Sequence, residues 1–473
     1  MTEAQQDAVA ELLRTFPVVD ELGKLFHSNG FALHLVGGSV RDALLGRVSS
    51  DLDFTTDARP EQIQRIAAPW GDSVWDTGID FGTVGVGKGG LLIEITTFRS
   101  DTYDGDSRNP VVTFGDTLSH DLQRRDFAIN AMAISVPDHV FADPFDGLKD
   151  LAAQSLDTPA TPERSFADDP LRMLRAVRFA AQLGVTLAPR VRTAIVEMAP
   201  QLQRISTERV QAELVKLIMA PRPRAGLTLL VDTGLADLIL PELPALKLEK
   251  DEHHQHKDVY QHSLTVLEQA IAQEEYGPDQ TLRLAALLHD IGKPATRRFS
   301  EGGGVSFHHH EVVGAKLVRK RLRALKFPKQ ITEDVANPTF LHLRFHGYSG
   351  GEWTDSAVRR YVTDAGPLLP KLHKLVRADS TTRNQRRKAA LQAAYDSLEA
   401  RIVVIAAAED LARVRPDLDG NAIMRLLNVP AGPAVGKAWA FLKELRLERG
   451  PLDPEVATAE LLAWAEREGV TPQ

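Results

Sequence analysis

The hydrophobic pattern changes near Pro162, and this change constrains the fold more than any other feature of the sequence. Before it, FALHLVGG at 31–38 and LLIEITTF at 91–98 are predicted strands, and the SVRDALLG that follows the first strand begins a helix. After it, Leu, Ala, Val and Arg recur with a helical period throughout. We therefore predict an α+β protein whose mixed sheet is confined to the N-terminal part.

Breaks in composition divide the chain further. At 473 residues it is too long for one ordinary core. The Pro-rich stretch Leu240–Pro244 predicts a linker, and the composition becomes rich in Ala and Leu near Arg387. The predicted domains are 1–155, 156–244, 245–390 and 391–473.

The absence of cysteine excludes disulfides, thiolate zinc sites and a cysteine nucleophile. Any metal ligands must therefore be His, Asp or Glu. The acidic, amphipathic start MTEAQQDAVAELLRTF is unlike a secretory signal, and no long uncharged apolar stretch predicts a membrane span. We expect a cytoplasmic protein with no membrane partner.

Basic residues are concentrated in two segments, although the formal net charge is −8. Residues 316–329 include seven basic residues and no acid, and 371–388 include seven with the single acid Asp379. Such patches can hold a phosphate backbone even on an acidic chain. On charge alone, solvated helix faces are the simpler interpretation, and the segments that would contact RNA stay open.

A glycine pair followed by two acids forms the first chemical motif. Gly37 and Gly38 end a strand and let a ligand approach the backbone, at the start of a helix that contains Arg41. Asp51 and Asp53 are two residues apart on a predicted strand, so they point to one face. Because paired carboxylates repel each other unless a divalent cation separates them, the motif predicts two Mg²⁺ ions beside a triphosphate.

A third carboxylate is expected on a neighbouring strand. Glu94 is the candidate, because an isolated charge in an apolar strand needs a partner. The simpler alternative is a strand residue that faces solvent.

Two arginines precede an Asp and an Asn in RRDFAINA. The guanidinium groups of Arg124 and Arg125 suit phosphate oxygens, and Asp126 or Asn130 can bond the sugar hydroxyls. Taken alone, a helix with a surface ion pair would explain this motif better.

The segment DDPLRMLRAVRF begins with a helix-capping pattern. Pro170 suits a first helical turn, with Asp168 or Asp169 at the cap, and a capped helix with a basic stripe is the simpler interpretation. A carboxylate can also accept from the exocyclic amine of A or C while an arginine donates to the adjacent ring nitrogen. G and U present the opposite pattern and would be rejected, so Asp169 with Arg172 would select ATP and CTP without a nucleic-acid template. The arginines of the stripe are Arg172, Arg175 and Arg178.

Four motifs, in this order, resemble those of class II tRNA nucleotidyltransferases, the CCA-adding enzymes and their bacterial poly(A) polymerase relatives: GGSVRD, Asp51-Leu-Asp53, RRDFAINAMA and DDPLRMLRAVRF. The resemblance covers roughly the first half of the chain. It implies a head of polymerase-beta type with Asp51 and Asp53 as metal ligands, followed by a helical neck with Asp169 and Arg172 as an amino-acid template. The sequence departs from the family at Asp168, usually Glu, and at Ala128, usually Thr. STERVQAELVK resembles the last motif of the neck, with Glu208, Arg209 and Glu213 structural or near the nucleotide.

Histidines and acids beyond the neck form an ordered set around the dipeptide His289-Asp290. Neutral imidazoles and carboxylates suit a divalent transition metal, which can activate water against a phosphoester. The set resembles the HD phosphohydrolase superfamily, and some bacterial tRNA nucleotidyltransferases have such a domain in this place. We favour an intact metal site over a helical scaffold that only helps to hold tRNA. The predicted ligands are His262, His289, Asp290, His310, His342 and Asp379.

The sequence thus predicts an enzyme in which the 3′-hydroxyl of tRNA attacks the α-phosphorus of CTP or ATP and pyrophosphate leaves. A poly(A) polymerase, or an enzyme that adds only CC or only A, is the alternative within the same chemistry. An HD phosphohydrolase acting on RNA ends, 2′,3′-cyclic phosphates or nucleotides is the alternative from another class. Intact Asp51 and Asp53 argue against that alternative, and the complete acidic and histidine sets argue against an inactive RNA-binding protein.

Overall fold

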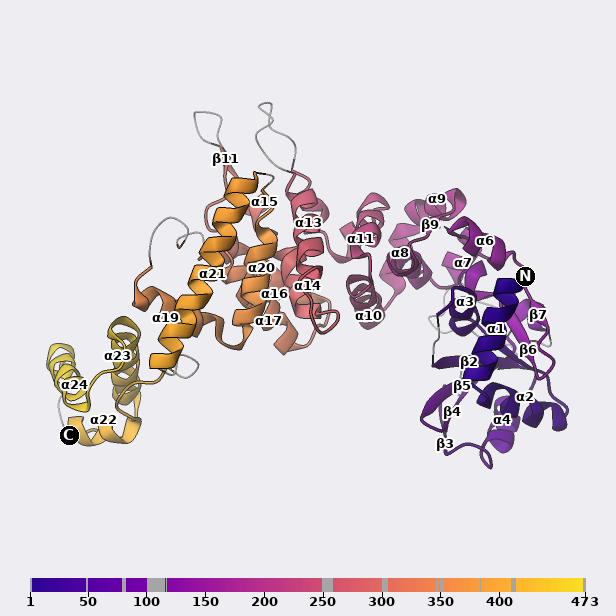
Figure 1. The fold of residues 1–473 in the computed structure, drawn as a ribbon, viewed down its shortest axis with the longest axis horizontal. Coiled ribbons are helices and arrows are strands. Elements are labelled where there is room, and N and C mark those ends of the chain that lie inside the picture. Colours follow the sequence, from indigo (N-terminus) through magenta and orange to yellow (C-terminus); the bar gives the residue numbers. More distant parts are fainter. Residues whose placement is uncertain are drawn as a thin grey trace. The chain divides into compact units, whose positions relative to one another are not determined.

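The structure is a computed structural model that forms two compact units, residues 1–239 and 240–473 (Figure 1). The first unit contains a mixed sheet and the second is almost entirely helical, as the α+β prediction requires. Within the described part of the chain, no helix is both long enough and apolar enough to cross a membrane. The described residues are 2–47, 50–78, 82–99, 115, 117–248, 258–299, 305–345, 348, 353–382, 384–409 and 414–470.

A seven-stranded sheet forms the centre of the first unit, in the order β3-β4-β5-β2-β1-β6-β7. β2 and β5 pair in parallel, and the other neighbours are antiparallel. The predicted strands at 31–38 and 91–98 are confirmed as β1 and β5. The strands are β1 Leu33–Val36, β2 Asp51–Thr56, β3 Ser73–Gly78, β4 Thr83–Lys88, β5 Leu91–Thr97, β6 Ala133–Val136 and β7 Phe141–Ala142.

The alternation of side chains along β2 explains which face carries chemistry. Leu52 and Phe54 are buried in the core, whereas Asp51 is exposed and Asp53 is partly buried. Helices α1, α2, α3 and α4 contribute apolar side chains to this core. The helices around the sheet are α1 Glu3–Thr15, α2 Val18–Ser28, α3 Gly38–Leu44, α4 Pro60–Ala67, α5 Leu118–Gln123, the 3₁₀ turn η2 Ala128–Asn130 and α6 Gly147–Ala153.

Helices complete the first unit, with α8 packed against both α10 and α11. The expectation of helix throughout after Pro162 is wrong in detail, because β9 Thr186–Leu187 pairs with β8 Ser155–Leu156. The helical elements are α7 Pro162–Asp168, α8 Leu171–Leu183, α9 Pro189–Met198, η3 Ala199–Arg204, α10 Thr207–Ile218, α11 Pro223–Asp232 and α12 Leu235–Ile239.

In the second unit, α14 packs against α13, α17 and α20, and α16 packs against α17. The small hairpin of β10 Arg298–Phe299 and β11 Val305–Ser306 again interrupts the predicted helical run. The helical elements are η4 Pro244–Leu246, α13 Val259–Ile271, α14 Gln280–Leu288, α15 Lys293–Thr296, α16 His310–Ala324, α17 Lys329–Leu341, α19 Asp355–Ala365, η5 Gly366–Leu368, α20 Leu369–Asp379, α21 Gln385–Ala408, α22 Gly420–Leu427, α23 Pro433–Arg449 and α24 Pro454–Glu468.

The last three helices enclose a small core of their own, which includes Ile423, Leu442 and Leu461. The predicted boundary between residues 390 and 391 falls inside α21, which continues without a break to Ala408. The division into head, neck, HD and tail domains therefore stays a prediction, and the structure itself separates two units.

Candidate active sites

Three carboxylates meet on neighbouring strands of the head. The parallel register of β2 and β5 places Asp53 opposite Glu94, and Asp51 precedes them on the same face of β2. Burial, together with the negative charges of Asp51 and Glu94, raises the pKa of Asp53 to about 6, although Arg125 opposes the shift. A carboxylate whose ionised form is disfavoured in this way suits a divalent cation. The predicted trio is therefore brought together, and its role as ligands stays a prediction.

The turn before α3 approaches these acids closely. Gly37 has a φ of 75°, a conformation that side chains other than glycine rarely adopt. A Cβ atom there would lie 3.3 Å from Nη1 of Arg125 and 3.4 Å from Oδ2 of Asp53. The glycine thus lets the backbone, an arginine and a carboxylate share one small space.

Arg124 and Arg125 are anchored by an acid that the sequence analysis missed. Asp121 is fully buried and pairs with Nη2 of Arg124 at 2.8 Å and with Nη2 of Arg125 at 3.3 Å. Although burial opposes it, the two guanidinium groups lower the pKa of Asp121. The available signal was its spacing, three and four residues before the arginines on a helix. The arginines are thus positioned beside the carboxylates, and contact with a triphosphate stays a prediction.

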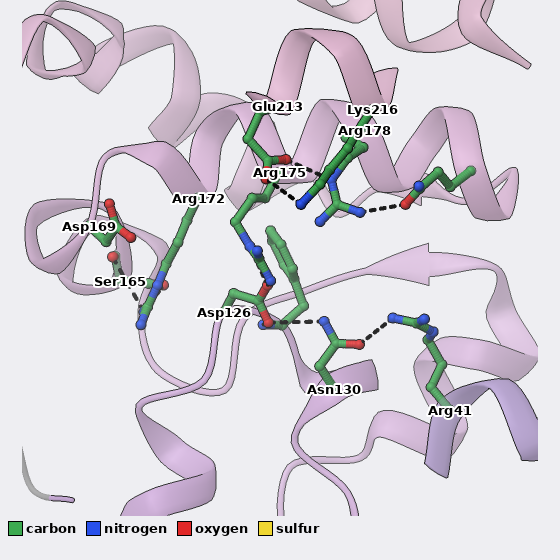
Figure 2. Close-up of polar contacts among 12 residues, drawn as sticks. Arg41, Asp126, Asn130, Ser165, Asp169, Arg172, Arg175, Arg178, Glu213 and Lys216 are labelled. Carbon is green, nitrogen blue, oxygen red and sulfur yellow. Dashed lines mark hydrogen bonds and ion pairs between the residues drawn. The ribbon is translucent and has the colours of Figure 1, made fainter. Parts of the chain in front are cut away.

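A chain of hydrogen bonds connects α3 to α8 (Figure 2). Nη1 of Arg41 donates to Oδ1 of Asn130 at 2.6 Å, and Nδ2 of Asn130 donates to Oδ1 of Asp126 at 3.0 Å. Oδ2 of Asp126 accepts from Nε and Nη2 of Arg175 at 2.8 and 2.6 Å. Although burial opposes it, Arg175 and Asn130 hold the pKa of Asp126 well below its usual range. Because these groups already bond one another, the network positions them, and their predicted sugar contact stays untested.

Asp169 and Arg172 lie at the junction of α7 and α8, and Figure 2 shows the bond from Arg172 to Ser165. Oδ1 of Asp169 accepts from the N–H of Leu171 at 3.1 Å, although the N-cap residue of α8 is Pro170 and not Asp169 as predicted. Arg172 donates to Oγ of Ser165 at 2.9 Å and to the carbonyl oxygen of Arg124 at 2.5 Å. The second contact ties Arg172, the arginine predicted to read the base, to the RRD motif, a link that spacing alone does not reveal.

Arg178, the third arginine of the stripe, pairs with an acid of the protein. Nε of Arg178 donates to Oε2 of Glu213 at 2.6 Å, and Arg178 is only 7% exposed. Burial lowers the pKa of Arg178, although Glu213 opposes this. The last motif of the neck therefore locks α10 onto α8, which favours a structural role for Arg178 and Glu213.

In the second unit, all six predicted HD ligands converge. They form two groups that can each hold a metal ion, His262 with His289 and Asp379, and Asp290 with His310 and His342. Asp290 faces both groups. Its Oδ2 lies 3.2 Å from Nε2 of His289, and its Oδ1 lies 3.2 Å from Nε2 of His310. Each group offers imidazole and carboxylate donors that would hold a divalent cation.

The histidine rings are oriented as metal ligands require. Nδ1 of His289, His310 and His342 lies 2.9, 2.8 and 2.6 Å from the carbonyl oxygens of Ala286, Phe307 and Thr339. Such bonds fix the tautomer with the proton on Nδ1. The Nε2 atoms of the three rings are buried without a hydrogen-bond partner among the described residues. Three buried ring nitrogens that face two carboxylates fit a cation-binding centre.

One residue at this centre was not predicted. Lys293 follows Asp290 by three residues, and its Nζ lies 2.6 Å from Oδ2 of Asp290. Its side chain is 21% exposed, so it reaches from the cluster towards solvent.

Three family models match the chain in succession. The Poly A polymerase head domain matches residues 33–157, the probable RNA and SrmB-binding site of polymerase A matches 184–246, and the HD domain matches 259–410. Over 438 residues the chain is 32% identical to the A-adding tRNA nucleotidyltransferase of Deinococcus radiodurans, covering 91% of this chain and 95% of that protein. The chain belongs to the tRNA nucleotidyltransferase family. It combines the class II motifs of that family with an HD domain.

The chain matches other members of the family over different shares of their length. The CC-adding tRNA nucleotidyltransferase of Thermus thermophilus is 33% identical over 436 residues, covering 91% of this chain and 93% of that protein. The CCA-adding enzyme of Levilactobacillus brevis is 44% identical over 207 residues, and the match spans 44% of this chain and 51% of that enzyme. The chain thus spans about half the length of this curated CCA-adding relative. The structure of the Bacillus stearothermophilus CCA-adding enzyme in complex with CTP aligns with a TM-score of 0.68 and 25% identity, covering 99% of both chains.

Proposed function

We propose that this tRNA nucleotidyltransferase adds CCA to the 3′ end of tRNA from CTP and ATP. The observation that carries the proposal is the carboxylate trio of Asp51, Asp53 and Glu94, which lies beside Arg125 within the same unit as the Asp169–Arg172 pair. The first group can hold the reacting phosphates and the second can read the base. The expected location is the cytoplasm, where tRNA is found.

The donor set at the head fits Mg²⁺. Three carboxylates supply only hard oxygen ligands, and the raised pKa of Asp53 indicates a site without enough positive charge of its own. When bound there, two Mg²⁺ ions would lower the pKa of the attacking hydroxyl and neutralise the leaving group. Asp51 and Asp53 would hold them, with Glu94 as the third acid.

The chemical step is an in-line transfer at the α-phosphorus. The 3′-oxygen of tRNA forms the new bond to phosphorus, the bond to the β-phosphate oxygen breaks, and pyrophosphate leaves. Arg124 and Arg125, held by Asp121, would orient the triphosphate against the Gly37–Gly38 turn. Because little covalent chemistry falls to the protein, positioning and charge stabilisation would supply most of the rate.

Base selection would follow from hydrogen-bond patterns. Asp169 can accept from the exocyclic amine of cytosine or adenine while Arg172 donates to the neighbouring ring nitrogen. This pair accepts both C and A, which favours one site that adds all three nucleotides. The relatives matched over most of their length are A-adding and CC-adding enzymes, so partial addition is the main alternative, with poly(A) synthesis as another.

Primer extension tests the proposal. tRNA transcripts that end before CCA, after the first C and after CC would each receive CTP with ATP, or one of CTP, ATP, GTP and UTP alone, with the nucleotides labelled and Mg²⁺ present. We expect CCA completion on all three, no use of GTP or UTP, and no activity in Asp51→Ala/Asp53→Ala. Extension of only some primers would indicate CC or A addition, long A tails would indicate a poly(A) polymerase, and no incorporation would refute transfer.

A second activity is favoured by the three buried Nε2 atoms of the HD cluster, which make no hydrogen bond among the described residues. We propose a metal-dependent phosphohydrolase that uses a divalent transition metal, for which neutral imidazoles are suitable ligands. The six HD residues would hold the metal, and the bound metal would supply an activated water. Hydrolysis of 2′,3′-cyclic AMP with added Mn²⁺ or Ni²⁺ tests this, with His289→Ala/Asp290→Ala as the inactive control. Equal turnover by the control would refute it.

A further inference from the structure

Both basic segments include cations that pair with carboxylates of the protein. In 316–329, Arg319 and Arg323 pair with Glu333, and Arg321 pairs with Glu242. At least three of the seven cations of this segment therefore pair within the protein. The same holds for the first half of the second segment, whose paired cations are Lys371 with Asp279, Lys374 with Glu275, and Arg377 with Asp396 and Glu399.

The remaining cations of the second segment lie just beyond a metal ligand. Asp379 ends α20, and Oγ1 of Thr381 lies 3.2 Å from Nδ1 of His262. Asn384 then caps α21, whose first turn exposes Arg386, Arg387 and Lys388. Within the ranges that the structure describes, no carboxylate pairs with these three cations. Arg383 lies outside the described residues.

A second group of basic residues follows the other side of the cluster. Lys293 touches Asp290, and the chain continues through Arg297 and Arg298 to Phe299, which is 66% exposed. The guanidinium of Arg297 lies 4.6 Å from the ring centroid of Phe299. In Figure 1, α15, the β10–β11 hairpin and the first turn of α21 lie at the same end of the second unit. We call these residues the HD rim: Lys293, Arg297, Arg298, Phe299, Arg386, Arg387 and Lys388.

Cations spread along two segments, together with an exposed aromatic ring, suit a chain of phosphates with bases better than a single phosphate. A mononucleotide would engage the metal centre and one or two cations, and the rest of the rim would have no role. We propose that the HD rim binds single-stranded RNA and delivers the phosphate at its end to the HD cluster, an inference that rests on the proposed HD activity. In that reaction, the oxygen of water bonds to phosphorus, the bond from phosphorus to a ribose oxygen breaks, and that oxygen takes the proton.

RNA binding without added metal tests the rim directly. Fluorescence anisotropy would follow a labelled eight-nucleotide RNA with a 3′-phosphate on the full chain, from 50 to 200 mM salt. In Arg386→Gln/Arg387→Gln/Lys388→Gln, the slope of log affinity against log salt should fall by about 2, since each phosphate contact to a single strand contributes about 0.7. Phe299→Ala should weaken binding about fivefold or more through lost stacking.

A matched variant controls for net charge. Arg425→Gln/Lys437→Gln/Arg467→Gln removes three exposed cations from α22, α23 and α24. It should bind the RNA as the unchanged protein does. Equal binding by the rim variant, or competition by poly-glutamate as strong as that by RNA, would overturn the proposal.

Turnover separates this inference from the proposed HD activity. With Mn²⁺ present, the substrates would be 2′,3′-cyclic AMP and the same RNA ending in a 2′,3′-cyclic phosphate. For the rim variant, the ratio of kcat/KM on RNA to kcat/KM on the mononucleotide should fall about tenfold. An unchanged ratio would refute the rim even where HD hydrolysis occurs. Rim-dependent RNA binding without hydrolysis of either substrate would refute the HD activity and support the RNA surface.

Discussion

The guanidinium of Arg209 donates a hydrogen bond to Oδ2 of Asp169 at 2.8 Å, while the N–H of Leu171 donates to Oδ1 of the same carboxylate. Both oxygens are therefore oriented by the protein before any nucleotide binds. Because each carboxylate oxygen has two lone pairs, Asp169 keeps acceptor capacity for the amine of a base. If Asp169 reads the base as proposed, Arg209 of the last neck motif would support base selection without touching the nucleotide.

Replacing Arg209 should therefore relax selectivity. In Arg209→Ala the carboxylate of Asp169 loses one of its two supports, and we expect the preference for CTP over UTP to fall about tenfold, since one hydrogen bond to a charged group contributes about 1.5–3 kcal/mol. The ratio of kcat/KM for the two nucleotides measures this, and Arg209→Lys should restore part of it. Arg192→Ala, an exposed arginine on α9, is the control. Unchanged selectivity in Arg209→Ala would contradict the positioning role.

The raised pKa of Asp53 predicts how stability depends on pH. Burial, with the charges of Asp51 and Glu94, raises this pKa from 3.8 to about 6, so the folded protein binds the proton more tightly than the unfolded chain. The resulting stabilisation is fully present below pH 3.8 and is lost as the pH rises through about 6.

In the metal-free protein, Asp53→Asn should therefore raise Tm by a few degrees at pH 7.5 and by less at pH 5. Mg²⁺ should stabilise the unchanged protein more at pH 7.5 than at pH 5, because protonation competes with the cation. Thermal melts at both pH values, with and without Mg²⁺, measure these effects. A Tm gain from Asp53→Asn that is the same at both pH values would contradict the role of Asp53.

The HD cluster should bind two ions per chain. Asp290 faces His262 and His289 with Oδ2, and His310 and His342 with Oδ1, so each oxygen serves one position. After loading with Mn²⁺ and desalting, the unchanged protein should hold about two ions and His342→Ala about one, as elemental analysis would measure. His309→Ala is the matched control, since this neighbouring histidine is largely exposed. Two ions retained in His342→Ala would contradict the second position.

The sequence predicted those parts of the sites that depend on local patterns, and not the contacts between residues far apart in the sequence. Asp51 and Asp53 could be placed because a strand has a period of two, and Glu94 because a charge in an apolar strand needs a partner. The contacts from Arg172 to Arg124 and from Arg175 to Asp126 join segments 48 and 49 residues apart, and no local rule predicts them. The hairpin β10–β11 was missed because two-residue strands carry no period. The continuity of α21 was missed because a change in composition need not end a helix.

Asp121 is buried and also positions Arg124 and Arg125, so its replacement should affect both stability and activity. It is completely buried, whereas the side chains of Arg124 and Arg125 are 23% and 19% exposed. Asp121→Ala should lower the free energy of unfolding by about 2–3 kcal/mol, somewhat less than the about 3–5 kcal/mol for a fully buried pair, because the arginines reach water. Denaturant unfolding measures this, and Glu11→Ala, which removes an exposed acid from a pair with Arg14, should show no measurable change.

Asp121→Asn separates positioning from stability. The amide keeps the shape and one acceptor but loses the charge, so the folded protein should persist while KM for both CTP and ATP rises about tenfold. The rise should be equal for the two nucleotides, because Arg124 and Arg125 would hold the triphosphate that they share, whereas Arg209→Ala should change the ratio between bases. A rise for one nucleotide alone would place Asp121 in base reading and contradict its assignment to the phosphates.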